Sequence, residues 1–200
     1  MTSDDSADIF DVLGSDHRAL LDLAATSATG DGELMPSRCE QLVMAVVRHF
    51  VAEEQYLLPL VRDRLTDGER ASKAAFEEHR TVEDELRRLE DLEHDPALAR
   101  PILADVEAAL RRHVTDQQEH LFPALAKRCD RAALRELADE VLGPEQLAPT
   151  RPRVVHAESA PLNKVVSLVV GYVDQIRDAY TRRGVQRLPR DHVHPNEGAE

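Results

Sequence analysis

The sequence repeats one segment, and this repeat strongly limits how the chain can fold. Residues 49–59 read HFVAEEQYLLP, and residues 113–123 read HVTDQQEHLFP. Each copy begins with a histidine and carries an oxygen-bearing side chain four residues later, Glu53 in the first copy and Gln117 in the second. Residues four apart share one face of an α-helix. Each copy therefore predicts a helix with nitrogen and oxygen ligands on one face, and two such faces turned inward can hold metal.

Helical periodicity extends beyond the repeat. Apolar residues recur at spacings of three and four, and no segment sustains an alternation of period two. Gly- and Pro-containing breaks separate predicted helices near residues 7–29, 36–65, 69–93 and 97–128, with a fifth from Asp130 to about Leu142. Short connections make neighbouring helices antiparallel. We therefore expect an all-α, up-down-up-down four-helix bundle over residues 7–142, with extra C-terminal helices.

The last part of the chain has a different pattern. Residues 143–161 contain several prolines and predict a linker, whereas residues 162–184 carry an apolar stripe that predicts an amphipathic helix. This helix can pack on its own bundle or dock to another subunit or protein partner. A membrane anchor is not expected, because the basic residues cluster only at its end. Residues 185–200 are expected to be disordered.

Charge and composition exclude several classes of partner. The net charge of −13 disfavours binding to nucleic acid and to anionic membrane surfaces. The start of the chain lacks the basic and apolar regions of a signal peptide, so we expect a cytoplasmic protein. Cys39 and Cys129 lack CxxC spacing and fall at opposite ends of the expected bundle. They are predicted to remain free thiols.

Four histidines are predicted to lie at one depth in the bundle, one in each helix: His17, His49, His79 and His113. Counted from the same end, each lies ~11 to 16 residues along its helix, or about 17 to 24 Å. Glu53 and Glu83 each follow one of these histidines by four residues. Buried imidazoles and carboxylates are costly unless they are paired or bound to metal. The set predicts a metal site, with a polar but metal-free core as the alternative.

These motifs resemble the hemerythrin-like HHE cation-binding domain. The resemblance covers about residues 7–128 and is carried by the two repeats and by the segments DHR at 16–18 and EHR at 78–80. It implies a four-helix bundle that holds a non-haem di-iron centre. It also implies the iron ligands, which are His17, His49, Glu53, His79, His113 and, with a less specific match, Glu83. Glu53 is implied as a bridge between two metals.

The second repeat departs from the family pattern at Gln117, where a second bridging carboxylate is usual. An amide carries no charge and offers a single carbonyl oxygen, so it does not bridge two cations as a carboxylate does. Binding of a second metal is therefore in doubt. Asp116 lies three residues after His113 and can substitute if the helix rotates slightly; otherwise it is a solvated charge on the helix flank.

Two further residues are candidates for the pocket. Tyr56 and His120 each lie seven residues after a motif histidine, within ~20° of it on an α-helical wheel. They can contact a bound ligand or the iron, or instead be boundary residues with polar tips in water. Glu54 and Gln118 lie about 140° from their histidines on the same wheel, so we expect them to be solvated.

Three functions fit these observations. The first is a non-haem iron protein that binds or senses dioxygen, nitric oxide, peroxide or iron. The second is a di-iron enzyme of the catalase or peroxidase type that disposes of peroxide, although no dedicated acid or base is visible beyond Tyr56 and His120. The third is a metal-poor helical scaffold with a degenerate site.

Overall fold

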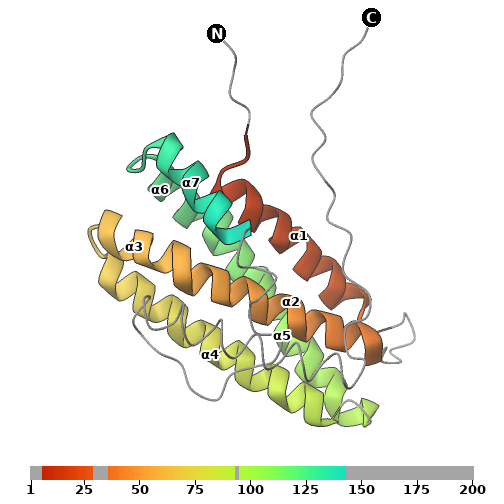
Figure 1. Ribbon diagram of the computed structural model, residues 1–200. Coiled ribbons are helices and arrows are strands. Elements are labelled where there is room, and N and C mark those ends of the chain that lie inside the picture. The colour runs from red at the N-terminus through yellow and green to blue at the C-terminus, as the bar shows by residue number, and fades with distance from the viewer. Residues whose placement is uncertain (1–5, 29–35, 93–94, 143–200) are drawn as a thin grey trace, which may run out of the picture.

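The computed structural model describes residues 6–28, 36–92 and 95–142, and these residues form helices without a β-strand (Figure 1). Two of the helical segments are π-helical turns, η1 (Glu53–Leu57) and η2 (Gln117–Leu121). The α-helices are α1 (Ile9–Thr26), α2 (Pro36–Ala52), α3 (Leu58–Arg64), α4 (Gly68–Leu92), α5 (Pro96–Asp116), α6 (Phe122–Ala126) and α7 (Arg131–Leu142).

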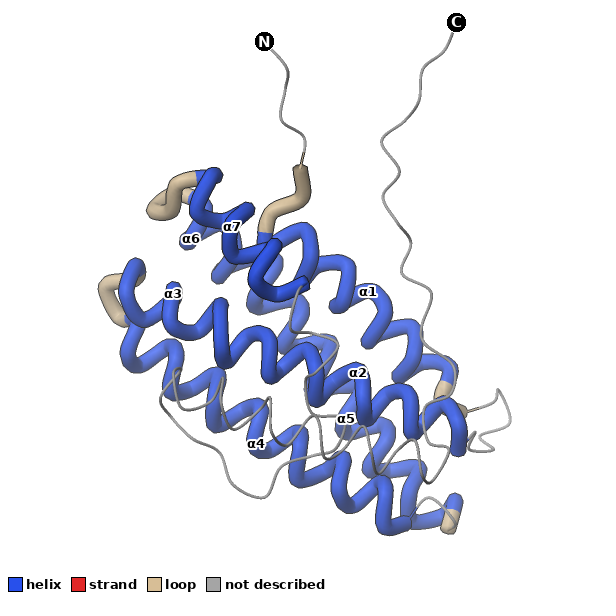
Figure 2. The backbone as a smooth tube through the Cα atoms, viewed as in Figure 1, coloured by secondary structure: helices blue, strands red, loops and turns tan. Residues whose placement is uncertain are grey.

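These segments make four long helical runs, because α2, η1 and α3 follow one another without a break, as do α5, η2 and α6. The run α4 packs against α3 and α5, and α1 packs against α2 and α5, which closes a four-membered ring of helices (Figure 2). The predicted all-α four-helix bundle is confirmed, and the predicted helices match the observed ones to within a few residues at their ends.

Local chemistry fixes where the helices begin. The Asp8 side chain caps α1 by accepting hydrogen bonds from the backbone N–H groups of Phe10 and Asp11. The Asp11 side chain in turn accepts a hydrogen bond from the backbone N–H of Asp8. Asp95 caps α5 by accepting from the backbone N–H of Ala97. At the start of α4, a Cβ on Gly68 would overlap backbone carbonyl oxygens of the preceding helix, so this tight turn requires glycine.

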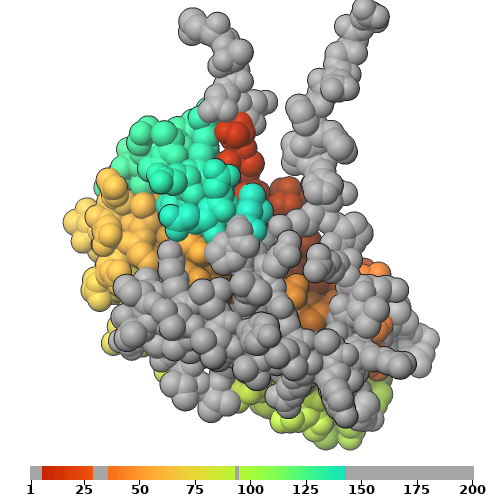
Figure 3. Space-filling model, in the orientation of Figure 1, coloured from red at the N-terminus to blue at the C-terminus, as the bar shows by residue number. Residues whose placement is uncertain are grey.

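The bundle core consists of two apolar layers separated by a polar level. Leu20, Val46, Leu86 and Leu110 belong to one layer, at the end where α1 finishes and α2 begins. The other layer contains Ile9, Leu57 and Leu125, together with Leu134 and Val141 of α7. Helix α7 packs against α1 and covers this end of the bundle (Figure 3). The motif histidines occupy the level between the layers, as their common predicted depth requires.

The two π turns were not predicted, and each ends two residues before a proline. Pro59 and Pro123 each sit in the first turn of the helix that follows. Proline has no N–H, and its ring clashes with the carbonyl group four residues earlier, which disfavours a regular α-helix around it, although α5 contains Pro101 without a π turn. A π turn, with hydrogen bonds between residues five apart, widens the helix at this point. The repeated Leu-Pro and Phe-Pro pairs therefore place an equivalent distortion in each motif copy.

The predicted linker at 143–161, the amphipathic helix at 162–184 and the tail at 185–200 lie outside the described residues. Within the part of the chain that the structure describes, no helix is both long enough and apolar enough to cross a membrane.

Candidate metal centre

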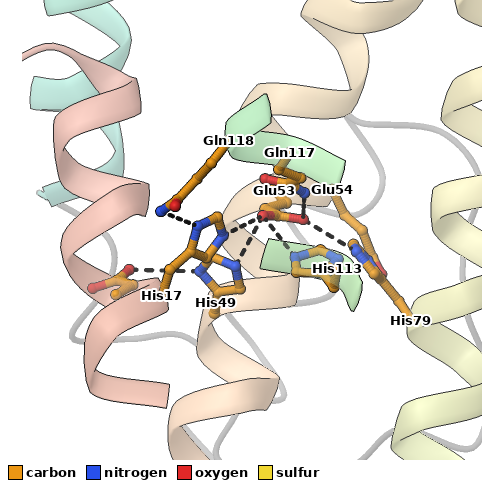
Figure 4. A network of polar contacts seen from close by, with 9 residues as sticks. His17, His49, Glu53, Glu54, His79, His113, Gln117 and Gln118 are labelled. Carbon is orange, nitrogen blue, oxygen red and sulfur yellow. Dashed lines mark hydrogen bonds and ion pairs between the residues drawn. The ribbon is translucent and has the colours of Figure 1, made fainter. Parts of the chain in front are cut away.

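Each of the four helical runs contributes one buried histidine to a cluster around Glu53 (Figure 4). The histidines are His17 on α1, His49 on α2, His79 on α4 and His113 on α5. Glu53 is the first residue of η1 and is completely buried. The depth predicted from the sequence thus agrees with the structure, which gathers these four imidazoles at one level.

The Nε2 atoms of all four histidines face the Glu53 carboxylate. Three of them lie near Oε1, at 2.9 Å for His49, 3.3 Å for His113 and 3.7 Å for His17. The fourth, of His79, lies 3.1 Å from Oε2. The Gln117 amide nitrogen donates a hydrogen bond to the same Oε2 at 2.9 Å. The ligand atoms of His17, His49, Glu53 and His113 all lie within 4.8 Å of one another.

The short distances between the four imidazoles and Glu53 are contacts without hydrogen-bond geometry. Among the described residues, no hydrogen-bond partner satisfies Glu53 Oε1 or the Nε2 atoms of the four histidines. Buried polar atoms without partners are costly, and native proteins satisfy nearly all of them. A cation at this place would satisfy several of these atoms at once. Imidazole nitrogens with a carboxylate oxygen are a donor set that suits iron and zinc, so these residues fit the metal that the sequence predicts.

Polar side chains lie beside the outer nitrogens of three of these rings. Glu54 Oε1 lies 3.2 Å from His79 Nδ1, Asp16 Oδ2 lies 3.8 Å from His49 Nδ1, and the Gln118 amide lies 3.3 Å from His17 Nδ1. Metal-bound histidines usually donate their second N–H to an acceptor such as the Glu54 or Asp16 carboxylate, which fixes the tautomer and the ring orientation. At His17 the contacting atom is the NH2 nitrogen of Gln118, which is a donor. The pattern leaves the Nε2 atoms directed at the centre of the cluster.

Aromatic rings restrict two of the imidazoles further. Phe50 stacks on His79 with ring centroids 4.0 Å apart and an interplanar angle of 4°. Phe122 is parallel to His17 within 3°, with centroids 5.8 Å apart. Because both phenylalanines are buried, these two rings are held from their faces as well as from their outer nitrogens.

The electrostatics of the cluster follow from burial and from Glu53. Burial opposes ionisation of Glu53, but the imidazoles of His113 and His49 outweigh it and hold the Glu53 pKa well below the usual range. Burial also opposes charge on His49, but Glu53 and Asp16 raise its pKa to about 10. Burial dominates at His17 and lowers its pKa to about 4.

The pKa of His79 rises to about 9 because Glu53 and Glu54 outweigh burial. At neutral pH, the metal-free centre therefore holds protons on His49 and His79. A metal ion that binds through these rings must displace the protons, so metal uptake is coupled to proton release.

Glu54 is buried, which contradicts the expectation that it is solvated, and the π turn explains the error. An α-helix returns to the same face after about four residues, whereas the hydrogen bonds of a π turn join residues five apart. Glu54 is five residues after His49, so the turn brings it to the buried side together with Glu53. Gln118 is the equivalent residue in the second copy; it is largely exposed as expected, but its amide reaches His17.

The structure does not bring His120 or Asp116 to the cluster. The His120 side chain is 71% exposed and pairs with Asp116, which is 79% exposed, at 3.5 Å. The alternative prediction, that both side chains are solvated, agrees with these exposed fractions. The expected position of His120 assumed seven residues of regular α-helix after His113, and the π turn beginning at Gln117 changes that phase.

Tyr56 and Glu83 are buried, and Glu83 is not one of the four residues whose ligand atoms converge. Tyr56 belongs to the apolar layer closed by α7. Its pKa is raised by burial and by the nearby charge of Glu140 on that helix. Glu83 is completely buried on α4, one turn after His79.

Comparison with known proteins agrees with the fold and the cluster. The family model described as the hemerythrin HHE cation-binding domain matches residues 8–125. An uncharacterised hemerythrin-like protein of Schizosaccharomyces pombe is 23% identical over 172 residues, which cover 85% of this chain and 85% of that protein. No solved structure matches the chain significantly. The chain belongs to the hemerythrin HHE cation-binding family.

Proposed function

We propose that this protein is a cytoplasmic non-haem iron protein that binds a small ligand, such as dioxygen, nitric oxide or peroxide, at the His and Glu cluster. The observation that carries the proposal is the convergence of four imidazole Nε2 atoms, one from each helical run, on the buried carboxylate of Glu53. Four histidines with this common orientation are expected of a metal centre and are not needed for a bundle core.

The residues that hold the ion on this proposal are His17, His49, His113 and Glu53, whose ligand atoms already lie together. An iron ion accepts up to six ligands, so these four leave positions that a small molecule can occupy. When bound, iron supplies the capacity to bind dioxygen, nitric oxide or peroxide. The protein supplies the ring orientations, through the partners of the Nδ1 atoms and through Phe50 and Phe122.

Burial favours a small ligand over a larger substrate. The four ligand side chains are at most 3% exposed, and apolar layers lie on both sides of them. A molecule of two or a few atoms can reach such a centre through transient openings between packed side chains. Burial also protects a reactive metal from chelation and from side reactions with solvent.

Two histidine variants on the same helical run provide a matched test. His113→Ala removes a buried ring of the cluster, whereas His120→Ala removes an exposed ring outside it. Iron per chain is measured after purification, and nitric oxide binding to the ferrous protein is followed by absorption and by electron paramagnetic resonance. We expect iron and nitric oxide binding in the parent and in His120→Ala, and loss of both in His113→Ala. Absence of iron from an iron-supplemented parent, or full iron in His113→Ala, would refute the proposal.

A further inference from the structure

The two oxygens of Glu53 have different surroundings, and this difference bears on how many metal ions the centre holds. Oε1 faces three imidazoles, those of His17, His49 and His113. Oε2 faces one imidazole, that of His79, and the amide nitrogen of Gln117. If Glu53 bridged two ions, one would lie on each side of the carboxylate, so each side can be assessed as a separate metal position.

The Oε1 side has enough ligands for one ion. One ligand atom from each of its three histidines and one from Glu53 lie within 4.8 Å of one another. Two ligands on opposite sides of an ion, with bonds of about 2.0 to 2.2 Å, are separated by roughly 4.0 to 4.4 Å. A small inward movement of the side chains therefore completes this position.

On the Oε2 side, the Gln117 amide takes the place where a second ion would need an anion. A carboxylate oxygen only accepts hydrogen bonds, so the amide group that faces Glu53 is the NH2 group, as the 2.9 Å contact shows. That group has no free lone pair for a metal. The hydrogen bond from this group also occupies Oε2, which is the oxygen through which a bridging Glu53 would bind the second ion.

Glu54 does not replace the missing anion. It contacts Nδ1 of His79, on the edge of the ring opposite the Nε2 atom that faces Glu53. A carboxylate in that position orients the ring from behind and is not directed at the ion that Nε2 would bind. Within the described part of the chain, the Oε2 side does not gather three converging His, Cys, Asp or Glu ligands.

We infer that this protein holds a single metal ion, bound on the Oε1 side by His17, His49, His113 and Glu53, and that Gln117 closes the second position by binding Glu53 Oε2. The inference rests on the proposed function, since it concerns the same iron centre. On this inference, His79 and Gln117 hold the Glu53 carboxylate from its far side. The family pattern has a second bridging carboxylate at position 117, whereas this protein has one ion beside the neutral amide of Gln117.

The test counts iron and determines its magnetic state in the full-length protein. Purified chain is loaded with ferrous iron, oxidised in air and passed through a desalting column. We expect one iron per chain and the electron paramagnetic resonance signal of an isolated high-spin ferric ion. Two irons per chain with a resonance-silent, coupled ferric pair would overturn the inference but leave the proposed function intact. No iron at all would overturn both.

Gln117→Glu tests the residue assigned to closing the second position. We expect iron per chain to rise from one toward two, with loss of the isolated ferric signal as the two ions couple. Gln41→Glu is the matched control, because it adds the same charge at a partly exposed position on α2 outside the cluster. The control is expected to stay at one iron. If Gln117→Glu also stayed at one, or if both variants rose equally, Gln117 would not be what closes the position.

Discussion

Removing the metal should lower the stability of the bundle by an amount that can be estimated in advance. A ligand that binds only the folded state stabilises it by RT ln(1 + [L]/Kd), which is about 2.7 kcal/mol when free metal is at 100 times Kd. Unfolding a domain spanning residues 6–142 carries an entropy of about 2.1 cal/mol/K per residue, so 1 kcal/mol shifts Tm by roughly 3 to 4 °C. Chelation of the parent should therefore lower Tm by about 9 °C.

His49→Ala separates the contribution of the metal from that of side-chain packing. His49 is a buried member of the four-ligand set and makes the 2.9 Å contact with Glu53. Its removal should abolish the dependence of Tm on chelator. Any remaining difference between the chelated variant and the chelated parent measures the loss of packing and of the contact itself.

Differential scanning calorimetry of both proteins, each with and without chelator, gives the four melting temperatures required. His120→Ala serves as the control and should keep the full effect of chelator, because its ring is solvated outside the cluster. If His49→Ala lost as many degrees on chelation as the parent, metal would bind somewhere other than this cluster. An unchanged Tm in the chelated parent, with metal removal verified by elemental analysis, would show that the bundle gains no stability from metal.

Two further predictions concern groups around and outside the centre. Folding raises the pKa of His49 to about 10 and that of His79 to about 9, above the ordinary 6.5. Their stabilisation is complete below pH 6.5 and is lost as the pH rises through 9 to 10, so the free energy of unfolding of the metal-free protein should fall over that range in urea titrations. Cys39, which is buried, and Cys129, which is half-buried, do not form a disulfide. Ellman's reagent should therefore titrate both in the denatured, unreduced protein, and a count of zero would contradict the topology.

Regular helical geometry was sufficient to predict the fold and the level of the four histidines from the sequence. The turns gave the helix boundaries, and a rise of 1.5 Å per residue placed His17, His49, His79 and His113 at one depth. The error in each predicted depth remains small, because the distance along a helix axis changes by only about one residue's rise when a single turn is distorted. The predicted depth of the four histidines was therefore correct even though the two π turns were not predicted.

Direction around the helix axis was more sensitive than depth. Each residue of an α-helix turns by about 100°, so a single change in hydrogen-bond pattern moves every later side chain to another face. This is why Glu54 was expected in solvent but is buried, and why His120 was considered for the pocket but lies on the surface. Pro59 and Pro123 were the available signal, because proline inside a helical run favours a distortion before it. The signal is not specific, since Pro101 lies inside α5 without a π turn.

The same π turns explain why the two copies of the repeat differ in chemistry while sharing a backbone. In both copies the turn begins four residues after the histidine and directs two consecutive side chains toward the cluster. The first copy presents carboxylates there, Glu53 to the centre and Glu54 to the outer edge of His79. The second copy presents amides, Gln117 to Glu53 and Gln118 to His17.

A pair of cations needs anions from both copies, whereas a single cation needs them from one, because each unneutralised charge is costly at low dielectric. The asymmetry of charge between two nearly identical turns is therefore the physical basis for expecting one metal ion and not two.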